Sequence, residues 1–101
     1  MAVETVLARY HFKADREAEL RSLLKRHWKT LHNLGFTTDT KPVIYRGTEQ
    51  RGDEGFYLEI FEWKDGAFEK AHTHPEVVAL WEPMEACCTR TEFPHAEPAR
   101  L

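Results

Sequence analysis

The chain has 101 residues, of which 42% are apolar and 31% are charged, and its formal net charge is −3. This composition is typical of a single soluble globular domain with a modest core. Nucleic-acid-binding domains usually carry a basic stripe. The negative net charge and the scattered lysines and arginines therefore argue against a nucleic-acid partner.

The N-terminus lacks the basic start and uninterrupted apolar run of a signal peptide, and no segment approaches the roughly 20 apolar residues that span a bilayer. We therefore expect a cytoplasmic protein with no membrane partner.

The two cysteines, Cys87 and Cys88, are adjacent, so they cannot provide the disulfide framework of a secreted domain. Buried thiols are the simpler interpretation, and a paired redox or metal role is the alternative.

The first half of the chain predicts a strand, a helix and a second strand. Residues 3–12 are β-branched and aromatic, which indicates a strand. Asp15 is a suitable N-cap for a helix that runs to about residue 34, and Gly35 suits the position after its end. The helix carries one apolar stripe, formed by Leu20, Leu23, Leu24, His27, Trp28, Leu31 and Leu34. Pro42 can open an edge strand over residues 43–46.

The second half follows a polar loop over residues 47–55 and begins with a strand over residues 56–63. Asp65 is expected to cap a short helix over residues 66–71. A second helix is expected to begin at Pro75, with His74 as its N-cap and Pro83 limiting its length. Residues 86–93 form the last predicted strand, and residues 94–101 form an irregular tail.

Alternation divides the strand over residues 56–63 into two rows of side chains. Phe56, Leu58 and Ile60 are uniformly apolar, so we expect them to lie under the helices. The other row mixes aromatics with a carboxylate, as expected of a surface that is enclosed but holds something polar. Its members are Tyr57, Glu59, Phe61 and Trp63.

The order strand, helix, strand, strand, helix pair, strand is the ferredoxin-like βαββαβ pattern, an α+β fold. We expect one domain over residues 1–93, with both helical segments on one face of a four-stranded antiparallel sheet. The uncovered face would carry aromatic side chains, so we expect two subunits to close their sheets against each other. Such a homodimer is a dimeric α+β barrel.

The segments from Glu59 to Asp65 and from Ala71 to Pro75 resemble the dimeric α+β barrel superfamily, and within it the antibiotic biosynthesis monooxygenase-like proteins. Those proteins carry a similar acidic residue and tryptophan at the end of this strand and a histidine about nine residues later. Glu62, Trp63 and His72 match that pattern. The resemblance implies a barrel pocket for an aromatic or polyketide-like molecule and, in some members, oxygenation without metal or flavin.

Related barrels degrade haem, using an asparagine on the first strand together with a tryptophan and a histidine. The first strand of this chain has Arg9, Tyr10 and His11 and no asparagine, and this departure argues against haem degradation.

The candidate catalytic residues are His11 and Glu59, because neighbouring antiparallel strands can bring them together and a His–Glu pair can act as a general base. The structural alternative is a salt bridge that satisfies interface charges. The residues expected to line the pocket are Arg9, Tyr57, Trp63, His72 and His74.

His72 and His74 also form a His-x-His pair, which can chelate a divalent metal if a third ligand reaches it. A helix-junction role explains both histidines without a metal, because His72 falls at the end of one helix and His74 at the start of the next.

The favoured hypothesis is a homodimeric, cofactor-independent monooxygenase-like enzyme that acts on a small hydrophobic or aromatic molecule. Two alternatives remain: a non-catalytic, small-molecule-binding or stress-related barrel, and a metal-binding barrel that uses His72 and His74.

Overall fold

The computed structural model describes residues 3–101. These residues form five strands and three helices. In chain order these elements are β1 (Glu4–Phe12), α1 (Glu17–Asn33), β2 (Val43–Thr48), β3 (Gly55–Trp63), α2 (Ala67–His72), α3 (Pro75–Ala86), β4 (Cys88–Glu92) and β5 (His95–Ala96).

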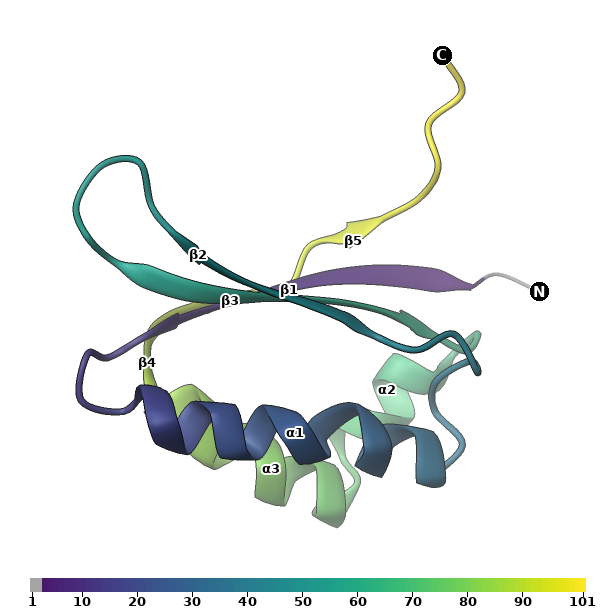
Figure 1. The fold of residues 1–101 in the computed structure, drawn as a ribbon. Coiled ribbons are helices and arrows are strands. Elements are labelled where there is room, and N and C mark those ends of the chain that lie inside the picture. The colour runs from purple at the N-terminus through teal and green to yellow at the C-terminus, as the bar shows by residue number, and fades with distance from the viewer. Residues whose placement is uncertain (1–2) are drawn as a thin grey trace.

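The strands form one antiparallel sheet in the order β2-β3-β1-β4, and the helices lie on one face of it (Figure 1). This arrangement confirms the predicted ferredoxin-like βαββαβ fold. The tail differs in one detail, because β5 pairs with β1 through Thr5 and Ala96 and through Val6 and His95. The predicted irregular tail therefore contains a short strand before the chain leaves the sheet.

The core lies between the sheet and the helices. The two rows of β3 side chains lie on the faces opposite to those predicted. Tyr57, Glu59, Phe61 and Trp63 are at most 4% exposed and point toward the helices. The uniformly apolar row, Phe56, Leu58 and Ile60, is only partly buried on the open face. The register explains this result: Val6 lies opposite Phe61 and Ala8 opposite Glu59, so the buried rows of β1 and β3 coincide.

Three helix boundaries differ from those predicted. The N-cap position of α1 is Arg16, without a side-chain cap, and that of α2 is Gly66, in the left-handed conformation. Asp15 and Asp65 therefore do not cap these helices. Pro83 lies inside α3 and does not limit it, so β4 begins only at Cys88. His74 does cap α3, since its Nδ1 accepts from the backbone N–H of Glu76 at 3.2 Å.

The open face of the sheet has no helix on it, and Figure 1 shows β5 and the C-terminal segment leaving the sheet on this side. It exposes apolar side chains of β2, where Val43 is 47% and Tyr45 58% exposed. Within the described part of the chain, no helix has the length and apolar character needed to cross a membrane.

Candidate active site

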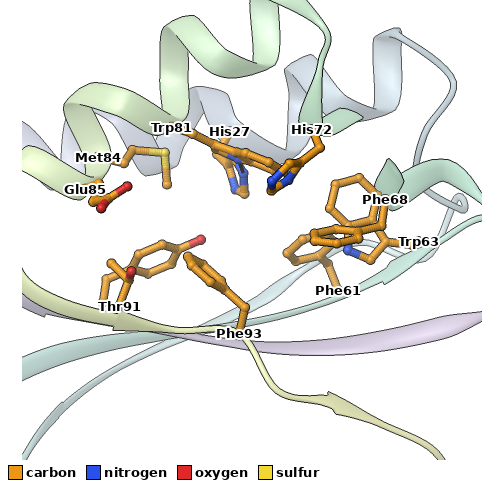
Figure 2. A pocket seen from close by; sticks show the side chains of 11 residues that line it. His27, Phe61, Trp63, Phe68, His72, Trp81, Met84, Glu85, Thr91 and Phe93 are labelled. Carbon is orange, nitrogen blue, oxygen red and sulfur yellow. Dashed lines mark hydrogen bonds between the residues drawn. The ribbon is translucent and has the colours of Figure 1, made fainter. Parts of the chain in front are cut away.

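A cavity of about 160 Å³ lies between the sheet and the helices. Its walls come from β1, β3 and β4 below and from α1, α2 and α3 above (Figure 2). Most of the lining is aromatic, with a few polar groups, which is the usual composition of a small-molecule site. The lining residues are Tyr10, His27, Phe61, Trp63, Phe68, His72, Trp81, Met84, Glu85, Thr91 and Phe93.

The aromatic wall is built from edge-to-face contacts. The ring of Trp63 lies 5.1 Å from Phe61, 5.8 Å from Phe68 and 6.3 Å from Trp81, all in T-shaped geometry. Such pairs stabilise beyond simple burial, by about 0.5–1.5 kcal/mol each. His72 closes the rim, with its ring 5.8 Å from Trp81. The wall is therefore fixed by mutual packing before any ligand enters.

The carboxylate of Glu59 lies fully buried behind this wall and accepts two hydrogen bonds at Oε1. Tyr10 donates its hydroxyl at 2.9 Å, and Nδ1 of His27 lies at 2.8 Å. The small side chain of Ala8, directly opposite Glu59, leaves room for this cluster. Tyr10 sits two residues further along β1, a diagonal that an aromatic side chain can span. Oε2 of Glu59 has no hydrogen-bond partner within residues 3–101.

The second ring nitrogen of His27 has a partner of its own. The indole N–H of Trp81 donates to Nε2 of His27 at 2.8 Å. An indole N–H can only donate, so Nε2 must carry a lone pair and the ring proton must sit on Nδ1. Nδ1–H then donates to Glu59. The hydrogen-bond network thus selects one neutral tautomer of His27, in which the basic nitrogen is the one bonded to Trp81.

Burial, reinforced by the charge of Glu59 and by the hydrogen bond to it, raises the pKa of Tyr10 well above its ordinary value. Tyr10 therefore remains a hydrogen-bond donor to Glu59 at every pH at which the protein is expected to work.

The predicted pairing of His11 with Glu59 is wrong, because alternation along β1 and β3 places them on opposite faces of the sheet. His11 is nonetheless fully buried, beneath charged side chains of the open face. Its Nε2 lies 2.9 Å from Glu92, and its Nδ1 lies 3.1 Å from Glu54. His11 therefore takes part in an ion-pair network, which corresponds to the structural alternative stated for it in the sequence analysis.

Three of the residues expected in the pocket lie elsewhere. Arg9 is on the open face, paired with Glu49 and stacked over the ring of Phe56. Tyr57 points toward the helices but away from the cavity, and its hydroxyl donates to Glu17 at 2.6 Å. His74 serves as the α3 cap. Of the predicted lining, the structure brings together Trp63 and His72.

The cavity also contains residues that the sequence did not assign to a site. His27 belongs to the predicted apolar stripe of the first helix, and neither Tyr10 nor Trp81 is among the candidate site residues of the sequence. The available signal was the spacing of His27 within the α1 stripe, three residues after Leu24 and four before Leu31, which aims it at the sheet. Its hydrogen-bond partners, Glu59 and Trp81, come from β3 and α3, which the sequence alone does not bring together with α1.

Neither a metal site nor a reactive thiol is indicated by the described residues. No group of three or more His, Cys, Asp or Glu side chains in residues 3–101 is arranged to hold a metal ion. Burial raises the pKa of Cys88 to about 11 and also raises that of Cys87. Both side chains therefore stay protonated near neutral pH, as expected of buried thiols.

Comparison with solved structures finds the same fold over nearly the whole chain. A variant of SnoaB, a cofactor-independent oxygenase from Streptomyces nogalater, is 20% identical with a TM-score of 0.75, and the match covers 100% of this chain and 97% of that one. A conserved protein from Methanosarcina mazei Go1 is 17% identical with a TM-score of 0.72, covering 98% and 95%. An antibiotic biosynthesis monooxygenase is 13% identical with a TM-score of 0.73, covering 96% and 99%.

These neighbours confirm the predicted resemblance to antibiotic biosynthesis monooxygenase-like proteins at the level of the fold. Identities of this size establish the fold alone. No family model matches the chain, and no curated protein matches it.

Proposed function

We propose that this protein binds a small aromatic molecule in the cavity between sheet and helices and oxygenates it with dioxygen, without a cofactor. The observation that carries the proposal is the cavity itself, an aromatic enclosure with a polar, tautomer-fixed histidine in its wall. The likeness in fold to SnoaB, described as a cofactor-independent oxygenase, supports the reaction type.

The volume of the cavity limits the ligand. An engineered protein cavity of about 150 Å³ binds benzene, so a cavity of about 160 Å³ fits one aromatic ring. Larger polyketide-like molecules would require the rim to open, and the rim includes Phe93, which is 50% exposed. A single-ring phenol or enolisable compound is therefore the best-matched substrate class.

The oxygenation needs no bound cofactor if the deprotonated substrate itself supplies the electrons to dioxygen. Removing a proton from a phenol or enol gives an anion that can pass an electron to dioxygen. When a CH₂ group is oxidised, one oxygen atom becomes its carbonyl oxygen, and the other leaves as water with the two hydrogens. The protein supplies enclosure, orientation and a proton acceptor.

The test combines binding and turnover. Phenol should quench the fluorescence of Trp63 and Trp81 on binding, and enolisable single-ring compounds should cause oxygen uptake above the protein-free rate. Thr91→Phe fills the cavity from β4 and should abolish both signals. The matched control is Val43→Phe on the open face, which should change neither. Binding without oxygen uptake would favour the non-catalytic barrel, and absence of binding would refute the site.

We further propose that two copies of the chain associate through their open sheet faces. The support is the apolar surface of Val43 and Tyr45 beside the partly buried row Phe56, Leu58 and Ile60. A face of this composition is rarely left in water. Light scattering at micromolar concentration should give twice the mass of one chain, and a monomer would contradict the barrel dimer.

A further inference from the structure

Nε2 of His27 is a basic nitrogen in the wall of the cavity and accepts a hydrogen bond from Trp81. His27 lines the space between helices and sheet, beside Trp81 and in contact with Phe61 of the aromatic wall (Figure 2). In the free protein the lone pair of Nε2 accepts a hydrogen bond from the indole N–H of Trp81, which belongs to the same cavity wall. A ligand hydroxyl that replaced this N–H would meet an oriented acceptor at hydrogen-bonding distance.

The orientation comes from the other side of the ring. The Nδ1 atom of His27 is tied to Glu59, which is itself held by the hydroxyl of Tyr10. The edge of the imidazole also packs against Phe61, with ring centroids 5.7 Å apart. A histidine whose one nitrogen is fixed by a buried carboxylate and whose other nitrogen faces a cavity has the arrangement of a general base with an orienting partner.

We propose that His27 is the catalytic base of this cavity and that it takes the hydroxyl proton of a phenolic or enolic ligand, with Glu59 as its positioning residue. The inference rests on the proposed function and names its base and its substrate class. His72 also lines the cavity, but it is exposed at the rim and has no carboxylate within bonding distance in residues 3–101.

The step transfers one proton and no other atom. The ligand O–H bond breaks, its electron pair stays on oxygen, and a new N–H bond forms at Nε2. The resulting imidazolium is balanced by the carboxylate of Glu59. Protonated Nε2 can no longer accept from Trp81, so the indole N–H becomes free to donate to the new oxyanion. Trp81 and His27 would then hold the anion with two donors, which is the arrangement that stabilises developing negative charge.

The experiment uses 4-nitrophenol, whose phenolate absorbs at a longer wavelength than the phenol. It is titrated with the protein at a pH at which the free compound is mostly protonated. The wild-type protein should bind it as the phenolate. His27→Gln should bind it as the neutral phenol. Glu59→Gln keeps the acceptor geometry but removes the charge, and should lower the bound phenolate-to-phenol ratio at least about tenfold.

Trp81→Phe provides a second arm that does not depend on the folding of the histidine variant. It keeps the aromatic bulk and removes the second donor to the oxyanion, so 4-nitrophenol should still bind as the phenolate, through His27, but more weakly than to the wild type. His32→Gln, on the same helix but paired with Asp39 outside the cavity, is the matched control and should behave like the wild type.

The outcomes separate the two proposals. If 4-nitrophenol does not bind to the wild-type protein, the proposed aromatic site is refuted, and the base is refuted with it. If it binds but stays protonated, or is ionised equally by His27→Gln, the role of His27 is refuted while the aromatic site stands. Unchanged affinity in Trp81→Phe would show that Trp81 does not donate to the bound phenolate.

Discussion

The indole N–H of Trp81 and Nε2 of His27 are 2.8 Å apart and join α3 to α1 across the top of the cavity. This single contact determines where the proton of His27 resides, since a donor-only partner leaves Nδ1 as the protonated nitrogen. It also connects Trp81 of the cavity wall to the hydrogen-bond network of His27, Glu59 and Tyr10. A change at Trp81 therefore alters both the shape of the site and the basicity available in it.

Glu59→Gln is expected to leave the stability of the protein nearly unchanged while impairing proton abstraction. With His27 neutral, an ionised Glu59 is a fully buried charge with two donors and no formal counter-charge, and taking such a charge out of water is costly. Glutamine removes the charge and keeps an oxygen for Tyr10 and His27, but its amide N–H₂ takes the place of Oε2, which has no hydrogen-bond partner in residues 3–101. Because the two effects oppose each other, we expect the free energy of unfolding, measured by urea denaturation, to stay within about 1 kcal/mol of the wild-type value.

The matched comparison for that prediction is Glu59→Ala, which removes the acceptor and leaves the hydroxyl of Tyr10 and Nδ1–H of His27 unpaired. Each buried unpaired donor costs about 1–3 kcal/mol, so this variant should be clearly less stable than the wild type. A loss of stability in Glu59→Gln as large as that in Glu59→Ala would contradict the role of Oε1 as the acceptor of both hydrogen bonds.

The sequence could predict the elements of this fold because their signals are local. The stripe of α1, the glycine after it and the Pro75 start of α3 each depend on residues within a few positions. The face of β3 could not be assigned in this way. Its uniformly apolar row, Phe56, Leu58 and Ile60, looks more like core than a row that contains a glutamate.

Contacts with other elements determine which row of β3 faces the helices. Glu59 is tolerated in the core because His27 from α1 and Tyr10 from β1 satisfy it, and neither contact has a sequence signature. For the same reason His11 appeared to be the natural partner of Glu59, whereas the register places it among Glu54 and Glu92 on the other face. The site was therefore predicted in its aromatic part, through Trp63 and His72, and missed in its polar part.

Glu17 is expected to make stability depend on acid pH. Its hydrogen bond from Arg46, followed by that from Tyr57, lowers the pKa of its carboxyl from 4.5 to about 2. Because the folded state holds this proton less tightly than the unfolded state, the contribution is complete above the unfolded value and is lost as the pH falls toward the folded value. Urea denaturation of the wild type and of Glu17→Gln should therefore show their largest difference above about pH 5 and convergence near pH 2. A difference that stays constant over this range would contradict the shifted pKa.

Tyr45→Lys is expected to weaken the proposed dimer without unfolding the chain. Tyr45 is 58% exposed on the open face, and tyrosine is one of the residue types that most often contribute strongly to interfaces. We expect the dissociation constant, measured by sedimentation, to rise at least about tenfold, which corresponds to about 1.4 kcal/mol. Ile44→Lys is the control: Ile44 is 42% exposed on the same strand, but its side chain lies on the helix side of the sheet. Equal effects of the two variants would indicate a general loss of stability of β2 and not a lost interface.

Phe93→Ala is expected to change which ligands the cavity accepts. Phe93 lies at the end of β4, lines the cavity and packs edge-on against Tyr10 with ring centroids 5.9 Å apart. Because its side chain is half exposed, its removal should cost little stability, on the order of 1 kcal/mol. It widens the cavity beside the ring of Tyr10, so a two-ring phenol such as 2-naphthol should gain affinity relative to phenol. Fluorescence titration of both ligands measures this ratio, with Val43→Ala on the opposite face as the control. An unchanged ratio would mean that the size limit is set deeper in the cavity, by the rigid wall of Phe61, Trp63 and Phe68.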